Sequence, residues 1–65
     1  MQKKKIKLNI KKYREKANIS QSELARALGV SHTAVGKWDS GQGFPRADML
    51  PRIATVLHCD IADFF

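Results

Sequence analysis

The segment 20–41 constrains the fold of this 65-residue chain more than any other stretch. Ser20 and Glu23 have the S-x-x-E spacing of a capping box, in which the serine hydroxyl and the glutamate carboxylate each accept from a backbone amide at a helix start. Two leucines then follow on one helical face. Gly29 stands where a helix ends in the left-handed conformation that glycine adopts without a steric penalty. The pattern therefore predicts a helix over 21–28 that stops in a tight turn.

A second helix is predicted over 32–40, with Ser31 as its N-cap. Ala34, Val35 and Trp38 recur on one face of this helix and are expected to point inward. The outward side chains are small or rich in hydrogen-bond donors, and none is acidic: they are His32, Thr33, Gly36 and Lys37. Two short helices, a glycine turn and a cationic second helix together predict a helix-turn-helix.

In such a motif the second helix enters the major groove of DNA, where base edges present distinct patterns of donors and acceptors. Lys37 can donate to guanine, and His32 can donate to guanine or to a phosphate. Thr33 can hydrogen-bond a base or contact the methyl group of thymine. Gly36 has no side chain to hold the helix away from the groove. The predicted base-reading residues are Ser31, His32, Thr33, Gly36 and Lys37. The alternative is an ordinary polar helix face.

Three further helices are predicted. Those over 8–17 and 47–57 are predicted because apolar residues recur there with helical spacing, and a last short one over 61–65 because Asp60 can cap it. Pro51 falls just beyond the first turn of the second of these, where it removes a backbone hydrogen bond and is expected to bend the helix. Since there is no strand pattern, the predicted fold is an all-α, compact five-helix bundle. The predicted core consists of Ile10, Tyr13, Leu24, Leu28, Val35, Trp38, Leu50, Ile53, Leu57, Ile61 and Phe64.

Twelve basic residues against six acidic ones give a net charge of +6. Such an excess favours a polyanionic partner, although solubility alone explains it in many small domains. Four of the lysines lie before residue 8, so we expect a basic N-terminal arm over 1–7 and a DNA-binding domain over 8–65. The arm fits two interpretations, a segment that follows a DNA groove or a solubilising tail.

Catalysis, metal binding and membrane insertion find little support in the sequence. Cys59 is the single cysteine, so neither an internal disulfide nor a cysteine-based zinc site is expected. His58 beside it has no third ligand and no catalytic partner at a credible spacing. No apolar run approaches the roughly 20 residues of a membrane span, and the basic start lacks the apolar stretch of a secretory signal. We expect a cytoplasmic protein that has no cofactor and is not an enzyme.

Residues across the whole segment 10–65 resemble the lambda-repressor-like family of phage and bacterial regulators, which includes Cro and XRE-type proteins. The likeness continues from the helix-turn-helix through Phe44 and Pro45, the helical segment 49–57 and the closing segment 60–65. The resemblance implies a lambda-repressor-like helical bundle with the helix-turn-helix in its second and third helices. The family signature falls on Gln21, Leu24, Ala25, Gly29, Val30, Ser31, Val35, Trp38 and Gly41.

The resemblance also implies roles for particular residues. Gln21 stands where the family uses a glutamine to contact phosphate, and the alternative is a solvated residue at a helix start. Arg14 and Asp39 stand where some members carry an ion pair, which fixes orientation more surely than it adds stability. The alternative is two independent surface charges. Further phosphate contacts are expected from Ser20, which is a cap first, and from two residues of the loop after the second helix of the motif, Gln42 and Arg46.

The sequence therefore predicts a sequence-specific double-stranded DNA-binding regulator of transcription, with repression expected rather than activation. One such domain covers half a site, so a homodimer on a near-palindromic operator is expected. Ile61, Phe64 and Phe65 are the candidate dimer contacts. The rival hypothesis is a protein-interaction module, such as an antitoxin-like or anti-repressor component. Its binding to a partner would survive neutralisation of Lys37 and Gln21.

Overall fold

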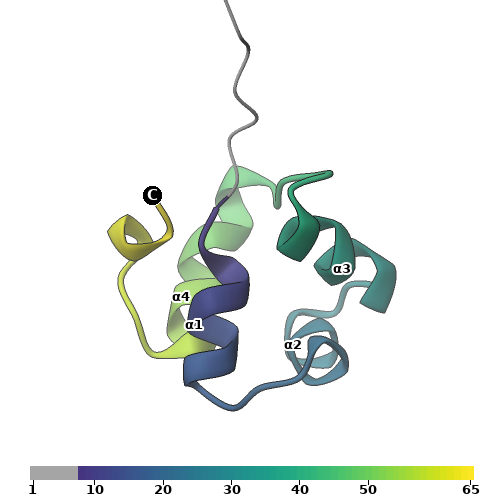
Figure 1. Cartoon of the computed structure of the whole chain (residues 1–65), viewed down its shortest axis with the longest axis horizontal. Coiled ribbons are helices and arrows are strands. Elements are labelled where there is room, and N and C mark those ends of the chain that lie inside the picture. Colours follow the sequence, from purple (N-terminus) through teal and green to yellow (C-terminus); the bar gives the residue numbers. More distant parts are fainter. Residues whose placement is uncertain (1–7) are drawn as a thin grey trace, which may run out of the picture.

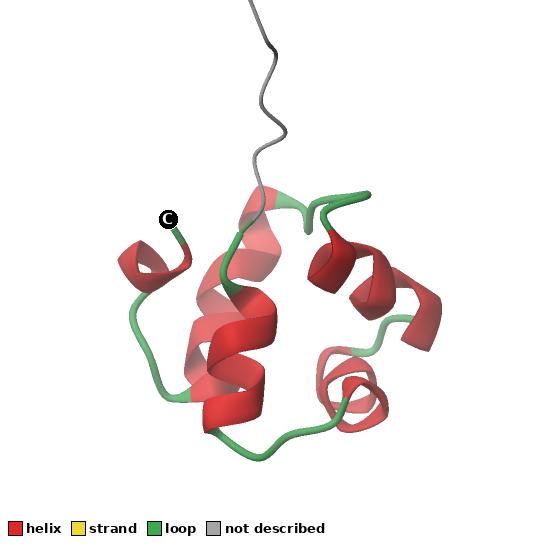
Figure 2. Ribbon diagram, viewed as in Figure 1, coloured by secondary structure: helices red, strands yellow, loops and turns green. Residues whose placement is uncertain are grey.

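The computed structural model describes residues 8–65, which form four α-helices and two short 3-10 helices. Figures 1 and 2 show α2 and α3 on one side of α1 and the C-terminal turn on the other. The described part of the chain contains no strand, so the predicted all-α class is confirmed. The predicted arm over 1–7 lies outside the described residues. In chain order the elements are α1 (Ile10–Lys16), α2 (Gln21–Leu28), α3 (His32–Ser40), η1 (Ala47–Met49), α4 (Leu50–Leu57) and η2 (Ile61–Phe64).

α2 has its predicted bounds because both of its ends are determined locally. Ser20 Oγ accepts from the amide of Glu23 at 3.0 Å, and Glu23 Oε1 accepts from the amide of Ser20 at 2.7 Å. The hydrogen bond from the amide of Ser20 favours the charged form of the Glu23 carboxylate and lowers its pKa. At the other end Gly29 has a φ of 73°, the left-handed conformation that ends the helix.

α3 also begins and ends at the predicted residues. Ser31 Oγ accepts from the amide of Ala34 at 3.1 Å, which caps the first turn. Gly41 ends the helix with a φ of 81°. The amide of Gln42 then donates to the carbonyl of Lys37 at 2.9 Å, so the following loop folds back onto the end of α3. The helix-turn-helix is thus specified by its two caps and its two glycines.

α1 is shorter than the predicted helix over 8–17. Its first residue is Ile10, because Asn9 has a non-helical ψ of 38° and its amide donates to the carbonyl of Phe64 at 3.0 Å. Leu8 is therefore outside the helix, yet its side chain is buried in the core. A contact 55 positions along the chain sets the start of this helix.

The predicted single helix over 47–57 is wrong in its first turn, which is the 3-10 helix η1. Pro51 has no amide to donate to the carbonyl of Ala47, so that carbonyl accepts instead from the amide of Leu50. The α-helical pattern starts only at Leu50, and Pro51 lies in the first turn of α4, where a missing amide costs little. The proline thus marks a junction between two helix types rather than a bend inside one helix.

The C-terminal segment also differs from the prediction, since it is a 3-10 helix and Phe65 lies beyond it. The five-helix count is therefore not confirmed. Phe64 is fully buried and meets the ring of Tyr13 edge to face at 6.3 Å between centroids. Ile61 is 38% exposed, so its assignment to the core is wrong, because this turn lies at the edge of the bundle. Tyr13 and Leu50 are half-buried rather than central. The buried members of the hydrophobic core that the predicted core lacks are Leu8, Ala25 and Ala54.

Candidate nucleic-acid interface

The two faces of α3 differ sharply in burial and in chemistry. Val35, Trp38 and Asp39 are buried against the rest of the bundle. The opposite face is exposed from the N-cap onward, at Ser31, His32, Thr33 and Lys37. The structure thus places four of the five predicted base-reading residues on one open surface. The hydroxyl of Ser31 accepts from the helix amide, which leaves its O–H free to donate.

Gly36, the fifth predicted base-reading residue, is half-buried where α3 faces the start of α2. A Cβ at this position would lie 3.9 Å from Oε1 of Gln21. This is an ordinary contact distance, so the fold itself does not require a glycine here. The missing side chain instead leaves open space beside the amide of Gln21. Gly36 is therefore placed to shape the surface between α2 and α3.

The predicted phosphate contacts lie on both sides of α3 along the chain. Ser20 and Gln21 begin α2, while Gln42 and Arg46 belong to the loop that follows α3. Three of the four are exposed, and Gln21 is half-buried. Arg46 makes a 3.3 Å ion pair with Asp48, and both side chains are largely exposed. Because solvent-exposed pairs contribute little, this pair leaves the guanidinium of Arg46 available to an anion.

Arg14, Asp39 and Gln21 form a polar cluster where α1, α2 and α3 meet. Arg14 Nη2 lies 2.8 Å from Asp39 Oδ2, in an ion pair whose side chains are 10% and 6% exposed. Gln21 Nε2 donates to the same carboxylate oxygen at 2.8 Å. Arg14 Nη1 donates to the carbonyl of Ile19 at 2.8 Å, which anchors the segment leading into α2. The cluster therefore ties the start of α2 to the last turn of α3.

Two contacts between helices could not be predicted from the sequence. The Gln21–Asp39 hydrogen bond spans 18 positions, and no spacing rule brings a residue at the start of one helix to the end of the next. Arg52 Nη2 likewise donates to the carbonyl of Leu28 at 3.4 Å, from α4 to the C-terminal end of α2. Cations stabilise helix C-termini in general, but the sequence does not show which helix end Arg52 will contact.

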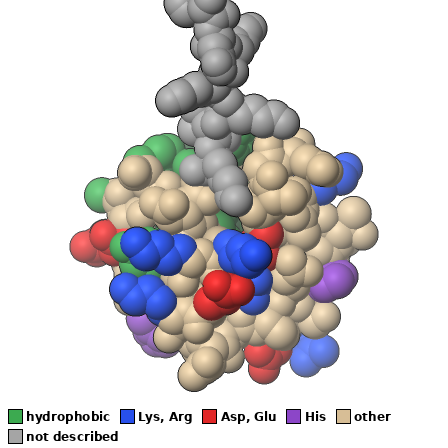
Figure 3. Space-filling model, viewed as in Figure 1, with side chains coloured by type: hydrophobic (Ala, Val, Ile, Leu, Met, Phe, Trp, Pro, Cys, Tyr) green, Lys and Arg blue, Asp and Glu red, His purple; other side chains and the backbone are tan. Residues whose placement is uncertain are grey.

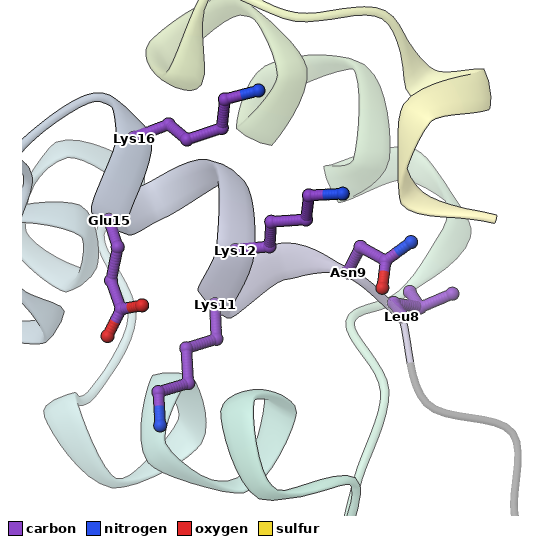
Figure 4. Close-up of a pocket in the computed structure, with 6 residues that line it drawn as sticks. All are labelled: Leu8, Asn9, Lys11, Lys12, Glu15 and Lys16. Carbon is purple, nitrogen blue, oxygen red and sulfur yellow. The ribbon is translucent and has the colours of Figure 1, made fainter.

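A second basic surface lies over α1. Figure 3 shows Lys and Arg side chains gathered on the face turned to the viewer, with acidic side chains among them. Figure 4 shows the open hollow beside α1, where Lys12 and Lys16 point one way and Lys11 and Glu15 another. The ammonium groups of Lys12 and Lys16 lie 5.6 and 5.1 Å from the ring centroid of Tyr13. Three of the six residues that line the hollow are lysines.

His58 and Cys59 follow α4 and do not form a reactive pair. His58 ends the helix in the left-handed conformation, with a φ of 57°. Burial raises the pKa of the Cys59 thiol, and the carboxylates of Asp63 and Asp60 raise it further. A raised pKa keeps the group protonated and poorly nucleophilic at neutral pH. Within residues 8–65, no three His, Cys, Asp or Glu side chains gather as metal ligands, and no helix is long and apolar enough to cross a bilayer.

Three known proteins are similar to this chain in sequence. The chain is 46% identical to the HTH-type transcriptional activator BcrR of Enterococcus faecalis over 37 residues, which are 57% of this chain and 18% of that protein. It is 35% identical to the cryptic phage CTXphi transcriptional repressor RstR of Vibrio cholerae over 57 residues, 88% of this chain and 51% of that protein. It is 34% identical to the ImmF control region 10 kDa protein of Bacillus phage phi105 over 58 residues, 89% of this chain and 64% of that protein. The chain thus spans less than two thirds of the length of each of these relatives.

The family comparison covers nearly the whole described structure. The sequence pattern of the helix-turn-helix family matches residues 10–64, from the first residue of α1 to the last residue of η2. The match contains the capped pair α2 and α3, the glycine turn between them and the polar cluster behind them. The chain therefore belongs to the helix-turn-helix family.

Proposed function

We propose that this chain is the DNA-binding part of a transcriptional regulator and that α3 reads base edges in the major groove of an operator. The observation that carries the proposal is the division of α3 into a buried face and an exposed, donor-rich face without a carboxylate. The helix fits the proposed site, since the major groove of B-DNA admits one α-helix. The proposal involves no cofactor and no catalytic step, and it places the protein in the cytoplasm with its DNA.

Base reading is assigned to the exposed face of α3 and the surface beside it. Lys37 donates to guanine, Thr33 contacts a base edge or the methyl of thymine, and His32 donates to guanine or phosphate. Ser31 at the N-cap and Gly36 beside α2 complete this surface. Phosphate binding is assigned to the flanks, and these contacts fix the register of the protein without reading sequence. The flanking residues are Ser20, Gln21, Gln42 and Arg46.

Repression is the mode of regulation that the relatives favour. RstR is named a transcriptional repressor, and the similarity to it extends over 88% of this chain. The activator BcrR matches over 57% only. A domain that occupies an operator represses by excluding other proteins from the same DNA, and it needs no additional surface for that effect.

We further propose that two copies bind a near-palindromic site. One helix-turn-helix covers half a site, and two-fold symmetric dimers place recognition helices about 34–36 Å apart, one turn of DNA. Ile61 and Phe65 are 38% and 74% exposed at the C-terminal end and are assigned to the dimer contact. Phe64 is fully buried, so it is not part of that contact.

Enrichment of duplexes from a random library tests this function most directly, because it yields the operator sequence and the half-site spacing together. About four to six phosphate contacts per subunit give a plot of log K against log salt with a slope of about −4 to −5. Lys37→Ala should cost about 1–3 kcal/mol on the enriched duplex and relax the preference at one base pair. Lys16→Ala on α1 is the charge-matched control and should leave that preference unchanged.

Two outcomes contradict the proposal. A slope near zero on every duplex would remove the DNA-binding function. Partner-protein binding that survives Lys37→Ala and Gln21→Ala, in a chain that enriches no duplex, would establish the protein-interaction module instead.

A further inference from the structure

Asp39 is a buried acid at the end of the predicted recognition helix, and one of its oxygens serves two other helices. Asp39 Oδ2 accepts from Arg14 Nη2 and from Gln21 Nε2, each at 2.8 Å. Asp39 Oδ1 is buried and has no hydrogen-bond partner among residues 8–65. The side chain of Asp39 is only 6% exposed, so its geometry is set by the protein rather than by solvent.

The hydrogen bond to Asp39 gives Gln21 a defined orientation. A glutamine at a helix start ordinarily has rotatable side-chain torsions, and ordering it on binding costs side-chain entropy. Here the Nε2 group is held by Asp39, and Oε1 faces the open space at Gly36. A primary amide has two N–H donors, so the second remains available to an anion. The amide is thus ordered before any ligand arrives.

The charge of Arg14 makes this arrangement compatible with phosphate binding. A lone carboxylate next to a phosphate-binding amide would repel the phosphate. The guanidinium of Arg14, 2.8 Å from the same oxygen, offsets that negative charge inside the cluster. Arg14 is in turn fixed by its bond to the carbonyl of Ile19, on the segment that precedes α2.

We propose that Asp39 is a positioning residue for phosphate binding. Its carboxylate holds the amide of Gln21 at the start of α2 and thereby couples the end of the recognition helix to a backbone contact. The inference rests on the proposed function, because it assigns to Gln21 a phosphate of duplex DNA. It adds that Asp39 acts on that contact without touching DNA itself.

A pair of neutral double variants isolates the contact. Arg14→Met/Asp39→Asn and Arg14→Met/Asp39→Leu both lack the buried charges, and their side chains at position 39 are similar in size. Only the first keeps a carbonyl oxygen that can accept from Gln21. Affinity is measured by anisotropy on a fluorescein-labelled duplex of random sequence, because a phosphate contact does not depend on sequence. The second variant should bind about three- to tenfold more weakly, the effect of one hydrogen bond.

Repeating both variants in a Gln21→Ala background separates positioning from a general structural effect. If Asp39 acts through Gln21, the difference in affinity disappears in that background. If the two double variants differ by the same factor with Gln21 and with Gln21→Ala, Asp39 affects the whole domain. If the two double variants bind equally well while Gln21 is present, the carboxylate of Asp39 does not position the amide. Either result overturns the proposal.

A measurement on the unmodified chain tests the ordering of Gln21 without DNA and without any variant. Nuclear magnetic resonance relaxation of the side-chain amide should give Gln21 a high order parameter, and the exposed Gln42 is the matched control with a low one. Equal, low order parameters would overturn the positioning role even if DNA binds tightly. An ordered Gln21 in a chain that binds no duplex would instead overturn the proposed function, and with it the phosphate assignment.

Discussion

Removing the guanidinium of Arg14 should destabilise the fold far more than removing an ordinary surface charge. Arg14→Met deletes the 2.8 Å contact to Asp39 and the 2.8 Å bond to the carbonyl of Ile19. It leaves Asp39, whose side chain is 6% exposed, with the amide of Gln21 as its remaining partner. Breaking a buried pair from one side costs about 3–5 kcal/mol. A chain of this length has a total stability of about 3–10 kcal/mol, so the variant should be close to unfolding.

The double change Arg14→Met with Asp39→Leu should recover most of this loss. Both charges are then absent, and two apolar side chains of similar volume fill the space between the helices. Gln21 loses its acceptor in this protein, but it is half-buried and can turn to water. The recovery would show that the cost of Arg14→Met comes from the stranded carboxylate and not from lost packing.

Urea unfolding of the four proteins of this cycle measures the coupling energy. Circular dichroism and the fluorescence of Trp38, the single tryptophan, give two independent probes of the same transition. The coupling should be at least about 2 kcal/mol, well above the range of exposed ion pairs. A loss below about 1 kcal/mol for Arg14→Met, with no coupling, would refute the reasoning, because it would mean that the carboxylate finds water or another partner.

Three further predictions concern substitutions in the core, at the helix ends and in the capping box. Trp38→Ala should abolish cooperative melting, because truncating a large buried aromatic side chain costs about 3–5 kcal/mol and a small domain has little more stability than that. A melting temperature near that of the parent would show that Trp38 contributes little packing. His58→Gly should stabilise the fold by about 1 kcal/mol in urea unfolding, because a residue with a Cβ is strained at a φ of 57°. Asn18→Gly, at a φ of 58°, is the control and should gain less, since asparagine tolerates this region, and equal gains would contradict the strain argument. The capping box of Ser20 and Glu23 holds the folded-state pKa of Glu23 below its ordinary value of 4.5, so its contribution is complete above that pH and is lost as pH falls through the folded pKa. Glu23→Gln should flatten the fall in stability below about pH 4.5, and an unchanged acid profile would mean that the box does not form.

The helix-turn-helix could be predicted residue by residue because its signals are local. The caps at Ser20 and Ser31 and the glycines at 29 and 41 act within one turn of the helices that they bound. The start of α1 could not be predicted in the same way, since it depends on the bond from the amide of Asn9 to the carbonyl of Phe64. Local chemistry fixes an element when its determinants lie within a few residues, and tertiary contacts decide the rest.

The candidate site also has a part that local sequence predicts and a part that depends on tertiary contacts. Exposure on α3 follows from helical periodicity, so the outward positions of His32, Thr33 and Lys37 were accessible to sequence reasoning. The contact of Gln21 with Asp39 depends on the angle at which α2 and α3 pack, and no pattern in either helix specifies it. Only the three-dimensional arrangement brings these two side chains together.

The chemistry of the polar cluster argues that stability alone does not explain its presence. Arg14 Nε and Asp39 Oδ1 are both buried without a hydrogen-bond partner among the described residues. Each such atom carries a desolvation cost of about 1–3 kcal/mol, which offsets much of the attraction within the ion pair. An apolar replacement of similar volume would pack at least as stably. What an apolar replacement could not provide is a hydrogen-bond acceptor at a fixed place beside the start of α2. The donor of α2 that uses this acceptor is the amide of Gln21. The cluster therefore contributes orientation more than stability, because the buried carboxylate of Asp39 fixes the direction of a polar group at the start of α2.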